Sequence, residues 1–290
     1  MTKINILLPL YNDWRSCNFL IRKINKELKK RSRYANIIIL NDFSTQKIDI
    51  NNKNLKNISK IKVLTSKKNL GSQKIISLGL EYIKNKRNEI IVVMDSDGED
   101  DVLQLNFLID NALEKKDLVI VASRIRRREN IIFKIFYKAH LLITYFFTFN
   151  WISFGNYSSF HTKNVRKILK NNDSWLAYSS CIIKNCKILK IDTERKKRFY
   201  DKSKLSFFGL FKHSIRVLSV FQKIIFYNSL IYISFLFVFK KIGIISFYSL
   251  LFLIFIILFF NFLILFIKKI TFKDFIEKKN TFIKKIINIK

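Results

Sequence analysis

A short apolar run that ends in a cluster of carboxylates is the feature that most constrains how this chain can fold. Residues 90–94 (IIVVM) are apolar and largely β-branched, which is typical of a strand buried on both faces of a sheet. Directly after them, five of the chain's 21 carboxylates fall between residues 95 and 101. Carboxylates this close repel one another unless a cation or hydrogen-bond donors hold them. A buried strand that carries Asp-x-Asp to the carboxyl edge of a sheet therefore predicts a ligand site at that edge.

The acidic cluster has two interpretations. Magnesium is usually held by one or two carboxylates together with substrate phosphates, and Asp95 and Asp97 provide such a pair. Alternatively, an acidic turn caps the next helix, because carboxylates are favourable near a helix N-terminus. We apply the first interpretation to Asp95 and Asp97 and the second to Asp100 and Asp101.

Strand-like and helix-like segments alternate along the first part of the chain. Apolar segments typical of strands lie at 3–10, 36–40, 61–64, 90–94 and 118–122, and helical spacing occupies 14–30, 72–82 and 103–113. This alternation predicts an α/β fold with a doubly wound, parallel sheet. The polar residues that follow the strands would share one crevice at the carboxyl edge: Tyr11, Asp13, Asp42, Asp95, Asp97 and Arg124.

The net charge of +33, from 54 Lys and Arg against 21 Asp and Glu, would usually indicate nucleic acid or an anionic membrane as a partner. However, Lys, Ile, Asn and Phe are abundant while Gly (6) and Pro (1) are scarce, as an AT-rich coding sequence would produce whatever the function. The chain has no reading helix, zinc module or aromatic RNA-binding motif, so we expect no nucleic-acid partner. Its three cysteines show no paired spacing, which favours reduced thiols.

The last third of the chain is dominated by apolar segments. Residues 205–222 are amphipathic and suit a helix that lies along a membrane surface. Residues 224–239 and 242–267 then run for 16 and 26 residues without a charge. The second segment is long enough to span a bilayer with some tilt, and we expect the two to form a membrane hairpin.

We therefore expect four parts in this chain. They are a catalytic domain at 1–204, a juxtamembrane amphipathic helix at 205–222, a two-helix transmembrane hairpin at 223–267 and a basic cytoplasmic tail at 268–290. Lys and Arg concentrate in the catalytic part and in the tail, so the positive-inside bias places both termini in the cytoplasm. The expected location is a bacterial inner membrane that the chain crosses more than once.

Six motifs resemble those of family 2 glycosyltransferases of the GT-A (Rossmann-like) fold. More narrowly, the chain resembles the membrane-anchored polyprenyl-phosphate branch, which includes dolichol-phosphate mannose synthase-like enzymes. The resemblance covers about residues 3–222 and rests on LPLYND (8–13), LNDFST (40–45), KNLGSQKIISLG (68–79), MDSDGED (94–100), ASR (122–124) and RFYDKSKLS (198–206).

The resemblance implies roles for the matching residues. The nucleotide sugar would be bound by Pro9, Tyr11, Asp13, Asp42, Gly71, Asp95 and Asp97. A Mg²⁺ or Mn²⁺ ion would be held by Asp95 and Asp97, with Glu99 as a further ligand. The catalytic residues would be Asp97, Arg124, Arg198 and Lys204, the last two closing over the phosphates of donor and acceptor.

Four residues depart from the family pattern. Asn41 and Phe43 replace Asp and Gly in the second motif, Asp201 replaces Gly in the last motif, and Asn156 stands where the family often has Asp. The departures leave two interpretations, a divergent working enzyme or a chain that has lost activity. We favour the working enzyme because the Asp-x-Asp pair occurs together with Arg198 and Lys204.

Asn156 also bears on the nature of the acceptor. A hydroxyl acceptor needs a general base, normally a carboxylate, whereas a phosphate acceptor is already an anionic nucleophile. Because an amide cannot act as that base, Asn156 favours a lipid phosphate. Arg126, Lys134 and Lys138 could steer this phosphate to the site or, equally, bind anionic lipid headgroups.

The sequence thus predicts a membrane-anchored, metal-dependent glycosyltransferase, with inversion implied by the family. It would move a sugar from a UDP- or GDP-sugar to undecaprenyl phosphate or a similar polyprenyl phosphate, and a homo-oligomer is compatible with the sequence. Three alternatives stay open. One is a transferase of the same fold that acts on a hydroxyl of a lipid-linked glycan, with Asp192 or Asp201 as the base. Another is a non-catalytic membrane subunit. The third is a basic protein that binds a membrane surface or nucleic acid, in which Asp95→Asn and Asp97→Asn would leave function unchanged.

Overall fold

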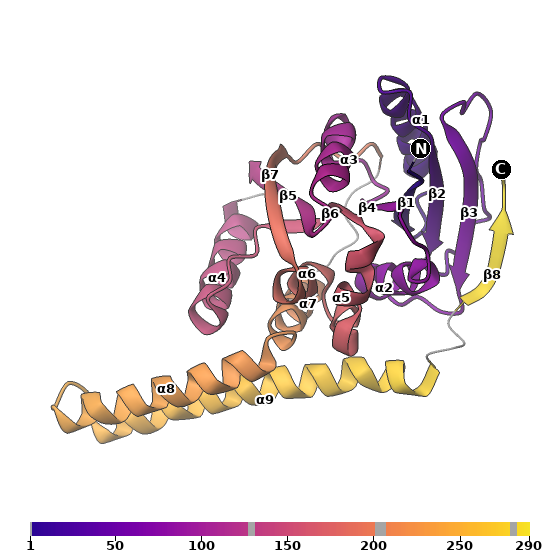
Figure 1. Ribbon diagram of the computed structural model, residues 1–290. Helices are drawn as coiled ribbons and strands as arrows, with labels where there is room; N and C mark the ends of the chain where they lie inside the picture. The colour runs from indigo at the N-terminus through magenta and orange to yellow at the C-terminus, as the bar shows by residue number, and fades with distance from the viewer. Residues whose placement is uncertain (1, 127–130, 201–206, 279–282) are drawn as a thin grey trace. The chain divides into compact units, whose positions relative to one another are not determined.

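The computed structural model describes residues 2–126, 131–200, 207–278 and 283–290 (Figure 1). The chain divides into two compact units. The first, here called the sheet unit, comprises Met1–Glu129, Ser153–Lys204 and Lys278–Lys290. The second, the helical unit, comprises Asn130–Ile152 and Leu205–Glu277. Each unit is therefore built from separate stretches of the sequence.

In the described residues, an eight-stranded sheet forms the centre of the sheet unit, in the order β7-β5-β6-β4-β1-β2-β3-β8 (Figure 1). The strands are β1 (Ile4–Leu10), β2 (Ala35–Asn41), β3 (Ile58–Ser66), β4 (Ile90–Val93), β5 (Leu118–Arg126), β6 (Phe154–His161), β7 (Lys187–Glu194) and β8 (Ile283–Asn288). Strands β1 to β4 pair in parallel, as do β5 and β7, whereas β6 and β8 run antiparallel to their neighbours. The predicted α/β fold is confirmed. The sheet is mixed and not wholly parallel, because the antiparallel strands β6 and β8, which the sequence does not predict, belong to it.

Helices cover both faces of this sheet. On one face, α1 (Trp14–Lys29) and α3 (Leu105–Glu114) pack against β1 and β4, with Leu20, Ile24 and Leu28 of α1 fully buried. On the other face lie α2 (Ser72–Ile83) and α6 (Tyr178–Asn185). Shorter helical segments are η1 (Val102–Gln104), η2 (Thr162–Asn164), α5 (Val165–Ile168) and η3 (Lys170–Trp175). All four residues of β4 are buried, as expected of a strand that is covered on both faces.

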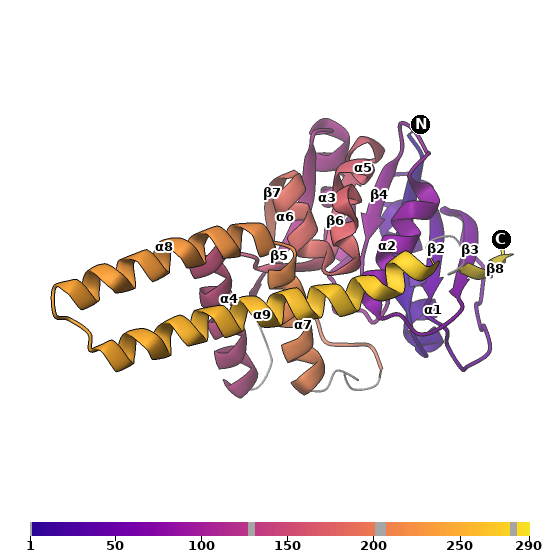
Figure 2. The same ribbon diagram turned by 90° about the horizontal axis from the view of Figure 1, so that it is seen from below.

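The helical unit contains α4 (Ile131–Thr148), α7 (Phe207–Ser219), α8 (Gln222–Lys241) and α9 (Phe247–Lys278) in its described residues. Figure 2 shows α8 and α9 as an antiparallel pair joined by a short turn. Gln222–Lys241 and Phe247–Lys273 are long and apolar enough to cross a membrane. Only 11% of the most apolar 18-residue stretch of each helix is buried. The Asn261 side chain donates a 2.8 Å hydrogen bond to the Ser229 hydroxyl and so joins the two helices.

The C-terminal segment differs from the basic tail that the sequence suggests for residues 268–290. Helix α9 continues to Lys278, and the chain then contributes β8 to the edge of the sheet, antiparallel to β3. The pairing extends beyond β8, because Ile289 donates a 2.9 Å backbone hydrogen bond to Ile61, and Ile61 donates one of 3.1 Å to Lys290. The end of the chain is thus part of the sheet unit.

Deleting residues 283–290 should destabilise the sheet unit, because the deletion exposes the β3 edge and removes a ladder of backbone hydrogen bonds. We expect the free energy of unfolding to fall by at least about 2 kcal/mol, since each bond contributes about 0.5–1.5 kcal/mol net. Denaturant unfolding in detergent, together with amide exchange along β3, measures this change. Lys284→Gln/Lys285→Gln, which keeps the backbone, should change the free energy of unfolding by less than about 0.5 kcal/mol. If the deletion variant keeps the free energy of unfolding and the slow amide exchange of β3, the assignment of β8 is wrong.

Candidate active site

The carboxyl ends of β1, β2 and β4 bring the predicted acidic residues to one edge of the sheet. Two hydrogen bonds hold the loops that follow these strands together. The Asp42 amide donates to the Leu10 carbonyl at 2.8 Å, and the Ser96 hydroxyl donates to the Pro9 carbonyl at 2.7 Å. The side chain of Ser96, between the two aspartates of the Asp-x-Asp motif, is therefore used to fix the motif to β1.

Arg198 brings two of the predicted site carboxylates together. Its guanidinium lies 3.1 Å from Asp97 Oδ2 and 3.8 Å from Asp13 Oδ2. Asp13 also accepts a 3.3 Å hydrogen bond from the Ser16 amide and so caps α1. The N-terminus of α1, the Asp-x-Asp turn and the segment after β7 therefore meet at this point.

The segment 195–199 lies along the acidic turn through its backbone as well as its charges. The Lys196 amide donates to the Glu99 carbonyl at 2.9 Å, and the Phe199 amide donates to the Asp97 carbonyl at 3.0 Å. Arg195 forms an ion pair with Glu99, whose role as a metal ligand stays a prediction. These contacts hold the 195–199 segment against the turn at residues 97–99.

Gly98 makes the close approach of this segment feasible. Its φ is +87°, in the left-handed region where a side chain is strained, and a Cβ there would overlap the Phe199 ring. Phe199 also packs edge-on against Phe19 of α1, with ring centroids 4.7 Å apart. An aromatic ring therefore seals the turn from one side, and only glycine leaves room for it.

The Asp97 carboxyl is in an environment that disfavours its charge. Burial, together with the negative charges of Asp95 and Glu99, raises the pKa of Asp97 to about 6, against the opposing effect of Arg198. A carboxylate destabilised in this way is a suitable ligand for a hard divalent cation, which would compensate the repulsion. The donor set at Asp95 and Asp97 therefore fits Mg²⁺ or Mn²⁺. Within the described residues, no three His, Cys, Asp or Glu side chains cluster as a complete metal site, so substrate oxygens would have to complete the coordination.

Asp95 is oriented by a chain of amide side chains that the sequence did not reveal. Asn156 at the start of β6 donates a 2.9 Å hydrogen bond to Asp95 Oδ1, and Gln73 of α2 donates one of 3.1 Å to Asn156. Gln73 in turn accepts the Tyr178 amide at 2.7 Å, at the start of α6. Asp100 accepts the backbone amide of Asp95 at 2.8 Å, in keeping with a structural role for that residue.

Asp42 has a structural function in addition to its predicted contact with the nucleoside. Its two carboxylate oxygens accept the backbone amides of Leu70 and Gly71, each at 2.7 Å. Burial raises the pKa of Asp42 even though these hydrogen bonds favour its charged form. Asp42 thus fixes the loop that leads into α2, and Gly71 in that loop has a φ of +86°. The contacts of both residues with a nucleotide sugar stay predictions.

Phe43, which stands where the family has glycine, keeps the turn that glycine would allow. Its φ is +58°, in the left-handed region. Its amide donates to the Asn41 carbonyl at 2.9 Å, and its ring is 40% exposed with the ammonium of Lys284 5.8 Å away. Phe43 at this position therefore strains the backbone but does not change the conformation of the loop.

The remaining predicted site residues are distributed as follows. Pro9 is buried in β1, and Tyr11 is 40% exposed in the loop after it. Lys134 and Lys138 are exposed on α4, in the helical unit. Lys204 and Asp201 lie outside the described residues, as do the side chains of Arg124 and Arg126, whose backbone belongs to β5.

The raised pKa of Asp97 gives a test of the site through stability. Between pH 4 and 6 the folded state binds a proton that the unfolded state has lost, so the free energy of unfolding falls as pH rises and is level above that range. Asp97→Asn removes this loss, which amounts to about 3 kcal/mol. We expect the variant to be more stable than the wild type at pH 7.5 in EDTA, with little difference at pH 4.

Denaturant unfolding at the two pH values measures the difference. The matched control is Asp192→Asn, which removes one exposed carboxylate from β7 and should shift the free energy of unfolding by less than about 0.5 kcal/mol. If Asp97→Asn is instead less stable than the wild type at pH 7.5, the pair with Arg198 outweighs the burial of the charge.

Comparison with known proteins identifies the fold and the family of this chain. The solved structures similar to this chain include glucosyl-3-phosphoglycerate synthase from Mycobacterium tuberculosis in complex with Mn²⁺, UDP and glucosyl-3-phosphoglycerate, with a TM-score of 0.52 and 12% identity over 77% of this chain and 80% of that one. They also include mannosyl-3-phosphoglycerate synthase from Rubrobacter xylanophilus, with a TM-score of 0.53 and 13% identity over 77% of this chain and 73% of that one. No curated protein matches the sequence. The profile of glycosyl transferase family 2 matches residues 5–172. That match covers more than half of the chain, so the chain belongs to glycosyl transferase family 2 and is a glycosyltransferase.

Proposed function

We propose that this glycosyltransferase moves a sugar from a UDP- or GDP-sugar to a polyprenyl phosphate such as undecaprenyl phosphate, at a membrane surface. The donor class is supported by structures of glucosyl-3-phosphoglycerate synthase, an enzyme of similar fold, which include complexes with UDP or UDP-glucose and Mn²⁺ and a complex with UDP and Mg²⁺. The acceptor and the membrane association rest on this chain's own residues.

Asp95 and Asp97 would hold the divalent ion between the enzyme and the donor diphosphate. When bound, such an ion neutralises the charge that develops on the leaving nucleoside diphosphate. Arg198, 3.1 Å from Asp97, would add a second positive charge beside the same phosphates. Asn156 keeps Asp95 in a fixed orientation, which lowers the reorganisation needed when the donor binds.

The chemistry of the Asn156 side chain is the observation that best supports a phosphate acceptor. Its amide is hydrogen-bonded to Asp95 on one side and to Gln73 on the other, and an amide cannot remove a proton from a hydroxyl. A lipid phosphate needs no such base. The length and exposure of α8 and α9 favour an enzyme that meets its acceptor in a membrane. The exposed Lys134 and Lys138, one turn apart on α4, could then attract the acceptor phosphate or anionic headgroups.

A hydroxyl acceptor is the second candidate, because the similar structures are named for synthases of glycosylated phosphoglycerates and some contain phosphoglyceric acid. Such an acceptor would need a carboxylate base. Asp192 is exposed on β7, and Asp201 lies outside the described residues. We place this candidate second because no carboxylate occupies the position of Asn156.

Release of UDP or GDP from a panel of nucleotide sugars tests the proposed reaction. Purified protein in detergent, with Mg²⁺ or Mn²⁺, should release the nucleotide only when undecaprenyl phosphate is present. Asp97→Asn and Arg198→Ala should each lower the rate at least 100-fold, because each removes a group that neutralises charge at the leaving diphosphate. Lys167→Gln, an exposed residue outside the site, should leave the rate within twofold. Release that does not depend on the lipid phosphate but requires a hydroxyl acceptor would favour the second candidate.

Substitutions of Asn156 separate the two acceptors. Asn156→Asp replaces the hydrogen-bond donor to Asp95 with a third carboxylate, so we expect the rate with undecaprenyl phosphate to fall at least tenfold. Asn156→Ala removes the donor without adding a charge and should lower the rate less. A rate that rises in Asn156→Asp, with a hydroxyl acceptor, would instead identify this position as the place of a general base.

A further inference from the structure

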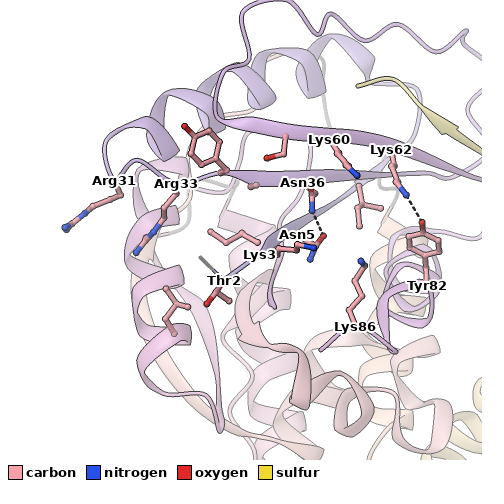
Figure 3. Close-up of a pocket in the computed structure, with 16 residues that line it drawn as sticks. Thr2, Lys3, Asn5, Arg31, Arg33, Asn36, Lys60, Lys62, Tyr82 and Lys86 are labelled. Carbon is pink, nitrogen blue, oxygen red and sulfur yellow. Dashed lines mark hydrogen bonds between the residues drawn. The ribbon is translucent and has the colours of Figure 1, made fainter. Parts of the chain in front are cut away.

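A pocket of about 540 Å³ lies at the amino edge of the sheet, the edge opposite to the acidic residues of the active site (Figure 3). It is lined by the starts of β1, β2 and β3, by the chain before β2 and by the end of α2. Six of its sixteen lining residues are Lys or Arg and none is Asp or Glu, whereas Lys and Arg make up 54 of the 290 residues of the chain. The pocket, here called the amino-edge pocket, is therefore basic beyond the background of this Lys-rich sequence.

The sheet register explains the polar floor of this pocket. Lys60 of β3 is paired with Asn36 of β2, and Asn36 is paired with Asn5 of β1, so the three side chains form one row across adjacent strands. The Asn36 amide donates to Asn5 at 3.2 Å, and the Asn5 amide donates to Glu89 at 2.6 Å. Such a row is normally apolar where a helix covers the sheet. Here α2 ends at Ile83, so the row opens into the pocket.

The positive charges of the pocket are only partly neutralised. Arg33 forms an ion pair with Asp110, and Lys86 lies 3.8 Å from Glu89. Lys62 contacts the neutral phenol of Tyr82 at 3.4 Å. The other cations are Lys3, Arg31 and Lys60, and none of these has an acidic partner among the described residues. Four like charges therefore lie around one pocket, and an anion bound among them would relieve their repulsion.

Figure 3 shows where the charges gather. Lys60 and Lys62 extend from β3 toward Lys86, and Asn5, Asn36 and Tyr82 lie around the same opening. Ammonium groups on flexible stems bind phosphate oxygens as point charges, and the amide and phenol groups add neutral donors. A single carboxylate would leave most of the charge uncompensated, whereas a phosphate or diphosphate carries two or more negative charges. The volume also falls in the range of small-molecule sites, about 300–1,000 Å³.

We propose that the amino-edge pocket binds a phosphate-bearing anion of charge −2 or greater, held by Lys60, Lys62 and Lys86. This site is separate from the donor site, because it lies at the opposite ends of the same strands. The phosphate could belong to a soluble metabolite or to the headgroup of a phospholipid. The chemistry of recognition is the same in both cases.

Calorimetric titration of the full chain in detergent tests this proposal, with pyrophosphate as the first probe. EDTA removes divalent ions so that binding at the donor site is suppressed, and 150 mM salt screens non-specific surface attraction. We expect one binding event whose affinity falls at least tenfold in Lys60→Gln/Lys62→Gln. It should change less than twofold in Lys167→Gln/Lys170→Gln, which removes the same charge from exposed positions outside the pocket, and less than threefold in Arg198→Ala.

A second titration, with dihexanoyl phosphatidic acid, identifies the source of the phosphate. Tighter binding of this soluble lipid than of pyrophosphate points to a headgroup, and the reverse points to a soluble metabolite, provided that Lys60→Gln/Lys62→Gln weakens either one. Because that variant relieves like-charge repulsion, its melting temperature should not fall, which separates a binding defect from unfolding. Equal weakening in both double variants, loss of binding in Arg198→Ala, or no binding of either probe would overturn the proposal.

Discussion

The candidate active site depends on how five carboxylates between residues 95 and 101 are held at close range. Arg195, Lys196 and Arg198 pair with Glu99, Asp101 and Asp97, and all three cations come from the segment that follows β7. Asn156 donates to Asp95, and the Asp95 amide donates to Asp100. Without these partners the turn would repel itself, so the 195–199 segment and the acidic turn stabilise each other. The raised pKa of Asp97 indicates that the compensation is incomplete, which leaves room for the positive charge of a metal ion.

The features of this fold that depend on residues close together in the sequence could be predicted from it. The apolar runs of β1, β2 and β4 and the acidic residues behind them follow from periodicity and turn chemistry. The partners of those residues could not be predicted, because Gln73 and Tyr178 are 105 positions apart and the contact of Arg195 with Glu99 spans 96. The sequence does not predict strand β6, because FGNYSSFH contains turn-favouring residues, although Ser158 and Ser159 are buried. The basic residues of β8 likewise indicate a tail, and only its pairing with β3 makes it a strand.

Two departures from the family pattern prove compatible with an ordered site. Phe43 adopts the left-handed backbone that its loop requires, and the two carboxylate oxygens of the neighbouring Asp42 hold Leu70 and Gly71. Asn156 serves as a neutral bridge, because an aspartate at the same place would face Asp95 without a proton between them. In each case the altered residue keeps the geometry of the loop and changes its chemistry.

The return of the chain to the sheet has a topological consequence. Residues 153–200 and strand β8 belong to the same sheet unit, although α7, α8 and α9 lie between them in sequence. Both ends of this helical insertion must therefore lie on one side of any bilayer that it enters, so the number of crossings is even whatever the distribution of lysines. The ribosome also completes both apolar helices before it releases the last strand of the sheet. The edge of the sheet can then close only after the hairpin has been made, so completion of the sheet follows synthesis of the two apolar helices.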